Sequence, residues 1–150
     1  MQEQIERDLK AALLSGDKKK VETLRLVKSV LLNEAISQNA RETGLDDDQV
    51  TKILSRESKK RAEAAELYEK VGETERAQAE QDEKAIIDVY LPAQLSEEEV
   101  QAVVDEELAK MENPSPADMG KVIGAVRSRL GARADGATIA RLVKAALEKQ

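Results

Sequence analysis

The chain has 150 residues, a net charge of −6 and an isoelectric point near 4.9, and charged residues make up 36% of it. It contains neither cysteine nor histidine, which excludes disulfides, thiolate chemistry and the commonest acid–base catalyst at neutral pH. Two tyrosines are its only aromatic residues, so its core must be aliphatic. Abundant Glu, Lys, Ala and Leu are typical of long amphipathic helices and predict an all-α fold.

Two helices are predicted before residue 40. The first runs from about Gln2 to Leu14 and is ended by Ser15 and Gly16. Asp17 then caps a second helix, which reaches about Gln38 and is about 33 Å long at 1.5 Å per residue. The residues expected to face the core are Ile5, Leu9, Leu13, Val21, Leu24, Val27, Leu31 and Ala35, and Val30 and Leu26 widen this stripe.

Two more helices follow. The aspartates at 46–48 place negative charge at the start of the third helix, where the helix dipole favours it, and Gly72 is its natural stop. Glu57 and Arg61 lie one turn apart on this helix and can form an i, i+4 pair. Its apolar face consists of Val50, Ile53, Leu54, Ala64, Ala65 and Tyr68. The fourth helix, about 74–90, is apolar mainly at its end, so its first half is expected to be exposed.

A helix boundary is predicted around Pro92. Proline has no backbone N–H and disfavours helical angles in the residue before it, so the fourth helix should end there. Ser96 offers an N-cap, and Glu99 sits where a capping box requires a carboxylate. Leu95 and Val100 occupy the two positions of a hydrophobic staple. These signals together indicate a hinge between two helical domains.

Three helices are predicted after this boundary. The first runs from Ser96 to about Lys110, and the Asn113–Pro116 segment then breaks the chain. The second ends at Gly131, and Asp135 caps the last. The residues expected to face a small core are Val100, Val103, Val104, Leu108, Met119, Ile123, Val126, Leu130, Ile139, Leu142, Val143, Ala146 and Leu147.

These elements predict two all-α domains. Residues 1–92 should form a bundle of four helices, in which the two long helices make a hairpin, and residues 93–150 a three-helix bundle. The N-terminus has no apolar signal-peptide stretch, and no run approaches the 18 apolar residues of a membrane span. We therefore expect a cytoplasmic protein that does not contact membranes.

No catalytic constellation is visible in the sequence. Capping, i, i+4 pairing or a solvated face accounts for almost every carboxylate, and neither an activated nucleophile nor a phosphate-binding loop is present. We therefore expect no catalytic residue, metal site or cofactor. An enzyme with carboxylate-only chemistry remains the least favoured alternative.

The charge is unevenly distributed. Residues 113–150 contain seven basic and three acidic side chains, a net charge of +4, which leaves −10 for the first 112 residues. Such a basic segment is a candidate for binding phosphates. Its candidate nucleic-acid-binding residues are Gly120, Lys121, Gly124, Arg127, Arg133 and Lys144.

Gly120 and Gly124 are the unusual members of this set, because a glycine inside a helix costs up to about 1 kcal/mol. They could allow close helix packing within the bundle, or they could form a smooth surface that an RNA backbone approaches, with Lys121 and Arg127 beside it. Lys144 lies opposite the apolar stripe of the last helix and could equally belong to a solvated face.

Several motifs resemble the YqeY-like family, and their order spans nearly the whole chain. They are the run 90–96 (YLPAQLS), the run 118–124 (DMGKVIG), the run 134–136 (ADG), the pieces 25–28 and 33–36, and the pieces 55–57 and 60–61. This family shares its C-terminal module, the GatB/YqeY domain, with the tail of the B subunit of the tRNA-dependent amidotransferase. The resemblance implies the same helical architecture, a link to carbon–nitrogen ligation with glutamine as amido donor, and a tRNA-facing role for the glycine-containing helix.

Two hypotheses for function remain. The first is an accessory or tRNA-binding protein related to the tRNA-dependent amidotransferase, whose partners would be tRNA and the amidotransferase or aminoacyl-tRNA machinery. The second is an adaptor that docks another protein through the acidic N-terminal hairpin. Binding of tRNA in a gel at low salt distinguishes them.

Overall fold

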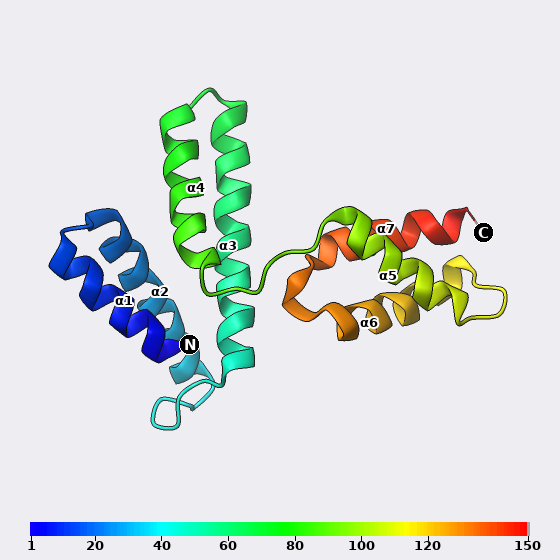
Figure 1. Cartoon of the computed structure of the whole chain (residues 1–150), viewed down its shortest axis with the longest axis horizontal. Coiled ribbons are helices and arrows are strands. Elements are labelled where there is room, and N and C mark those ends of the chain that lie inside the picture. The colour runs from blue at the N-terminus through cyan, green and yellow to red at the C-terminus, as the bar shows by residue number, and fades with distance from the viewer. Residues whose placement is uncertain (150) are drawn as a thin grey trace. The chain divides into compact units, whose positions relative to one another are not determined.

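The computed structural model describes residues 1–149 and is all-helical, which confirms the predicted fold class. These residues contain seven α-helices, two short 3-10 helices and no strand (Figure 1). The helices are α1 (Gln2–Ser15), α2 (Lys18–Ser37), α3 (Asp47–Lys70), α4 (Thr74–Asp88), α5 (Glu97–Ala109), η1 (Pro116–Asp118), α6 (Met119–Leu130), η2 (Gly131–Arg133) and α7 (Gly136–Glu148). They form two compact units, one ending at Leu91 and the other beginning at Pro92.

The first unit contains two helical pairs, α1 with α2 and α3 with α4 (Figure 1). The two longest helices, α2 and α3, were expected to form a hairpin, but α3 instead packs along its length with α4. Loop length explains this difference. Three residues join α3 to α4, which forces them to be antiparallel neighbours, whereas nine residues separate α2 from α3.

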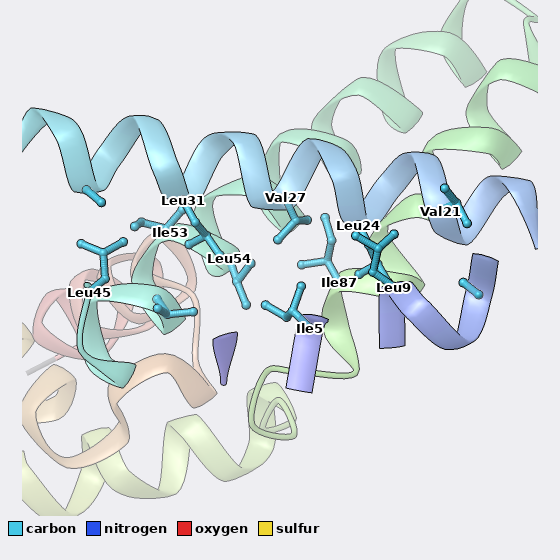
Figure 2. Close-up of a cluster of buried hydrophobic side chains, with 13 residues drawn as sticks. Ile5, Leu9, Val21, Leu24, Val27, Leu31, Leu45, Ile53, Leu54 and Ile87 are labelled. Atoms are coloured by element: carbon cyan, nitrogen blue, oxygen red, sulfur yellow. The ribbon is translucent and has the colours of Figure 1, made fainter. Parts of the chain in front are cut away.

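One aliphatic cluster joins the two pairs (Figure 2). Its buried members are Ile5, Leu9, Ala12, Val21, Leu24, Val27, Leu31, Ala35, Leu45, Val50, Ile53, Leu54 and Ile87. Leu13 and Leu26 were expected to be inward, but they are 50% and 51% exposed. At 3.6 residues per turn, Leu13 is rotated about 80° from Ile5, whereas the buried Ala12 is rotated by only about 20°.

Beyond this cluster, α3 and α4 are joined by small residues and polar contacts. Ala65 and Ala77 are buried at their interface. The Ser58 hydroxyl donates a hydrogen bond to Asp88, at 2.5 Å. The Arg61 guanidinium, whose side chain is only 11% exposed, donates to Glu57 at 2.9 Å and to Glu83 across the hairpin at 3.1 Å. The predicted Glu57–Arg61 pair is therefore confirmed and extends to a third residue.

The second unit packs α5, α6 and α7 around its own cluster. The buried residues are Val100, Val104, Leu108, Val122, Val126, Leu130, Ile139, Leu142, Val143 and Leu147. Met119 and Ile123 were expected to be inward but are only partly buried, and Val122 occupies the core position instead. Helix α5 begins with the predicted capping box, in which Ser96 accepts from the Glu99 N–H and the Glu99 side chain accepts from the Ser96 N–H.

None of the helices within residues 1–149 combines the length and the apolar character needed to cross a membrane.

Candidate functional site

The exposed face of α6 contains four of the six predicted site residues. Gly120, Lys121, Gly124 and Arg127 are all exposed. Their positions in α6 follow from the opposite face, where Val122, Val126 and Leu130 are buried. Ahead of α6, the chain turns through η1, where Ser115 and Asp118 form the two hydrogen bonds of a capping box. The start of α6 is therefore fixed by local hydrogen bonds, and its outer face is left open.

The glycines of α6 do not serve close packing within this unit. A Cβ atom added at Gly120 or Gly124 would meet nothing within 4 Å. The explanation by close helix packing is therefore wrong for the residues that the structure describes, although alanine at these positions would favour the helix by roughly 1 kcal/mol each. What the two glycines provide is a strip of α6 without side chains, open to solvent.

Arg127 lies against the start of α7. A Cβ atom added at Gly136 would sit 3.3 Å from Nη2 of Arg127, so glycine at the first residue of α7 leaves room for this guanidinium. Because Arg127 is four residues before Gly131, where α6 ends, its charge sits at the junction between α6, η2 and α7.

Arg133 is positioned by its backbone. It ends η2, and its carbonyl oxygen accepts a hydrogen bond of 2.8 Å from the Leu95 N–H. The Gln94 side-chain amide donates to the Ala132 carbonyl at 2.7 Å. These contacts hold the loop before α7 against the segment that leads into α5, while the side chain of Arg133 is exposed.

The basic residues of this unit differ in whether their charge is neutralised. Arg129 forms ion pairs with Glu106 and Glu107, at 2.8 and 3.2 Å, and Arg141 pairs with Glu97. Within the described part of the chain, the side chains of Lys121, Arg127, Arg133 and Lys144 form no ion pair or hydrogen bond. Each predicted site residue that carries charge is thus unpaired within the described residues, and so is Lys149 in the same unit.

The predicted site residues do not all lie on one element of the structure. Gly120, Lys121, Gly124 and Arg127 share α6, and Arg133 follows it directly in η2. Lys144 is exposed on α7, a separate helix. Ser128, which was not singled out, is also exposed on α6 and lies four residues after Gly124, so it lies on the same face of the helix, next to the glycine strip. Its i+4 spacing from the glycine was the signal that could have found it.

The unpaired cations of this face suit it to binding an anionic ligand. Across residues 1–149, no group of three carboxylates is placed to hold a metal ion. The perturbed titratable groups include Arg129 of α6, whose pKa the hydrogen bonds to Glu106 and Glu107 raise, and Tyr90, where burial first and then the hydrogen bond to the Asp8 carboxylate raise the pKa of the phenol well above its usual value. An exposed helix strip flanked by free cations can approach a phosphate backbone closely and neutralise it.

The fold and this surface define a class of all-helical protein with a basic, glycine-containing helix face. Comparison with family models gives the family directly, because the model described as "Yqey-like protein" matches residues 2–147. The match covers nearly the whole chain, and the protein therefore belongs to the Yqey-like family. The resemblance read from the sequence motifs is confirmed. Comparison with curated proteins gave no match.

Proposed function

We propose that this protein is an accessory, tRNA-binding protein related in function to the tRNA-dependent amidotransferase, with no catalytic machinery of its own. The observation that carries the proposal is the outer face of α6. Two glycines with open space around them lie beside cations that no carboxylate of the described chain neutralises. The link to tRNA amidation comes from the family resemblance of the 118–124 and 134–136 motifs.

The glycine strip supports binding to a backbone more than to a base. Without Cβ atoms at Gly120 and Gly124, a ligand can approach the α6 backbone more closely than at any alanine. In this proposal, Lys121 and Arg127 of α6 contact phosphates on either side of such a ligand, and Arg133, beyond the helix end, contributes a third cation. Contacts of this kind position a nucleic acid without reading its sequence.

The proposal also includes the division of the chain into two helical bundles. In it, residues 1–92 act as a four-helix bundle and residues 93–150 as a three-helix bundle that binds the nucleic acid. The acidic first domain contributes no favourable charge to this binding, so the proposal assigns recognition to the second domain alone.

The test is a titration of labelled tRNA with the RNA-free full-length chain at increasing salt. For about three phosphate contacts, the logarithm of the binding constant should fall against the logarithm of salt concentration with a slope of roughly −2 to −3. The variant R127E/R133E should lose binding without changing helical content by circular dichroism. The matched control is K10E/K52E, which makes the same charge change at exposed positions of the first unit.

Two results would refute the proposal. One is the absence of binding at 50 mM salt or below, since about three phosphate contacts are strongest there. The other is equal affinity of R127E/R133E and K10E/K52E, which would show that only net charge matters. Either result would favour an adaptor that docks a protein partner.

A further inference from the structure

The far end of the α3–α4 hairpin carries the net charge of the whole protein. Residues 62–83 contain eight acidic side chains and two basic ones, a net charge of −6. The other 128 residues are balanced, because the full chain also has a net charge of −6. This segment comprises the end of α3, the turn and the first part of α4, at the free end of the hairpin (Figure 1). We call it the acidic tip.

Most of this negative charge is not neutralised internally. Three carboxylates of the acidic tip are paired, Glu73 with Arg76, Asp82 with Lys19 and Glu83 with Arg61. The carboxylates without a cation partner in the described residues are Glu63, Glu66, Glu69, Glu75 and Glu80. Like charges this close together repel one another, so they destabilise the hairpin slightly in the free protein.

Two large aliphatic side chains are exposed among these carboxylates. Leu67 is 64% exposed and Val71 is 73% exposed. Leu67 lies in the last turn of α3 and Val71 is the C-cap residue that follows this helix, four residues on, so the two side chains are neighbours. They point away from α4, because Ala65 is the buried residue on the side that packs against it. The narrow alanine contact between the helices leaves no apolar surface that could cover Leu67 and Val71.

We propose that the acidic tip docks a basic amphipathic helix of another protein. Leu67 and Val71 would pack against aliphatic residues spaced at i and i+4 on the partner, and Glu63 and Glu66 would pair with flanking Lys or Arg. Charge decides between the candidate occupants. A second copy would bring a second tip of −6 against the first, and nucleic acids and anionic lipid surfaces are also repelled. This inference does not depend on tRNA binding by the second unit.

The experiment measures binding of the full-length chain to a labelled 15-residue helical peptide with Leu at i and i+4 positions and Lys on either side. The variant E63Q/E66Q should weaken binding about fivefold, from the loss of two exposed charge contacts. The matched control E3Q/E22Q removes two exposed carboxylates elsewhere in the first unit and should bind within about twofold of the parent.

A separate variant tests the apolar contact that the proposal assigns to Leu67. Replacing Leu67 by Ser should also weaken binding about tenfold, because the anchor would lose most of its buried area, while the melting temperature stays unchanged since this side chain is exposed in the free protein. Equal weakening by the tip and control variants, or full binding by L67S, would overturn the proposal. Self-association of the free chain that L67S abolishes would assign the face to a second copy and would also overturn it.

Discussion

At the scale of single residues, Arg61 makes one of the polar contacts between α3 and α4. Its guanidinium contacts Glu57 one turn earlier, through both a side-chain and the backbone oxygen, and Glu83 on α4. Glu57 also accepts from Lys60. Burial raises the pKa of the Glu57 carboxyl, but the hydrogen bonds from Arg61 and Lys60 outweigh burial and hold its pKa below the usual value.

This lowered pKa gives a pH prediction. A carboxyl whose pKa is lower in the folded state stabilises the protein above its unfolded pKa of about 4.3, and this stability is lost as the pH falls through the folded value. We expect the urea midpoint to fall less steeply below about pH 4.3 in Glu57→Gln than in the parent. The control is Glu63→Gln, at an exposed position, which should keep the parent slope. An unchanged slope in Glu57→Gln would contradict the argument.

Replacing a glycine of α6 is predicted to raise stability and to weaken tRNA binding at the same time. Gly124→Ala should raise the free energy of unfolding by roughly 1 kcal/mol, because the new methyl group meets nothing within 4 Å and alanine favours helix. It should at the same time weaken tRNA binding, because the methyl group lies on the proposed contact surface. Gly136→Ala gains less stability, since the new Cβ would press on the Arg127 guanidinium at 3.3 Å. Urea unfolding and tRNA titration of both variants test this, and unchanged affinity in Gly124→Ala would argue against the α6 surface.

At the scale of elements, local capping fixes where helices begin. Both α3 and α5 start with a complete capping box, from Asp46 with Gln49 and from Ser96 with Glu99. Such a box provides hydrogen-bond acceptors for two backbone N–H groups at the start of the helix, which have no partner inside it. Pairing between helices follows loop length instead, as the three-residue turn between α3 and α4 shows.

The cap of α5 predicts a measurable loss. Ser96→Ala should lower the free energy of unfolding by roughly 1 kcal/mol, because the Glu99 N–H loses its acceptor. Ser128→Ala is the matched control, since that serine is exposed in the last turn of α6 and alanine there should be neutral or slightly stabilising. Equal stability of the parent and Ser96→Ala would mean that the cap adds nothing to α5.

At the scale of the whole molecule, the two compact units meet in sequence at Leu91 and Pro92. Each has its own aliphatic cluster. The residues just after the boundary, Pro92 and Ala93, are exposed and outside any helix, whereas Gln94 and Leu95 are hydrogen-bonded to the loop before α7.

Limited proteolysis therefore gives a prediction for the domain division. Thermolysin should cut first near residues 92–95 or 112–116, and the first of these cuts should release a C-terminal fragment of about 55 residues that stays helical, because exposed chain between separate cores is the preferred cleavage site. Mass spectrometry identifies the cut, and circular dichroism of the purified fragment tests its folding. Resistance at these sites, or an unfolded fragment, would refute two independently folding domains.

Much of the local structure follows from the sequence because it depends on neighbours along the chain. The Ser96 cap joins residues three apart, and the Glu57–Arg61 pair joins residues four apart. The end of α6 depends on one residue, Gly131, which adopts a positive φ. The charge of the candidate site residues and their shared positions on α6 also follow from the sequence, and their role in binding stays a prediction.

What only the tertiary structure decided depends on which faces meet. The sequence predicted a hairpin of the two long helices, α2 and α3, which the structure does not show, and it left the purpose of Gly120 and Gly124 open between packing and exposure. The structure resolved both, because a three-residue turn holds α3 beside α4 and because no other segment of the second unit, as far as it is described, covers the α6 glycines. The sequence by itself determined where helices form, since hydrogen bonds and caps are local, and tertiary packing determined which surfaces remain for partners.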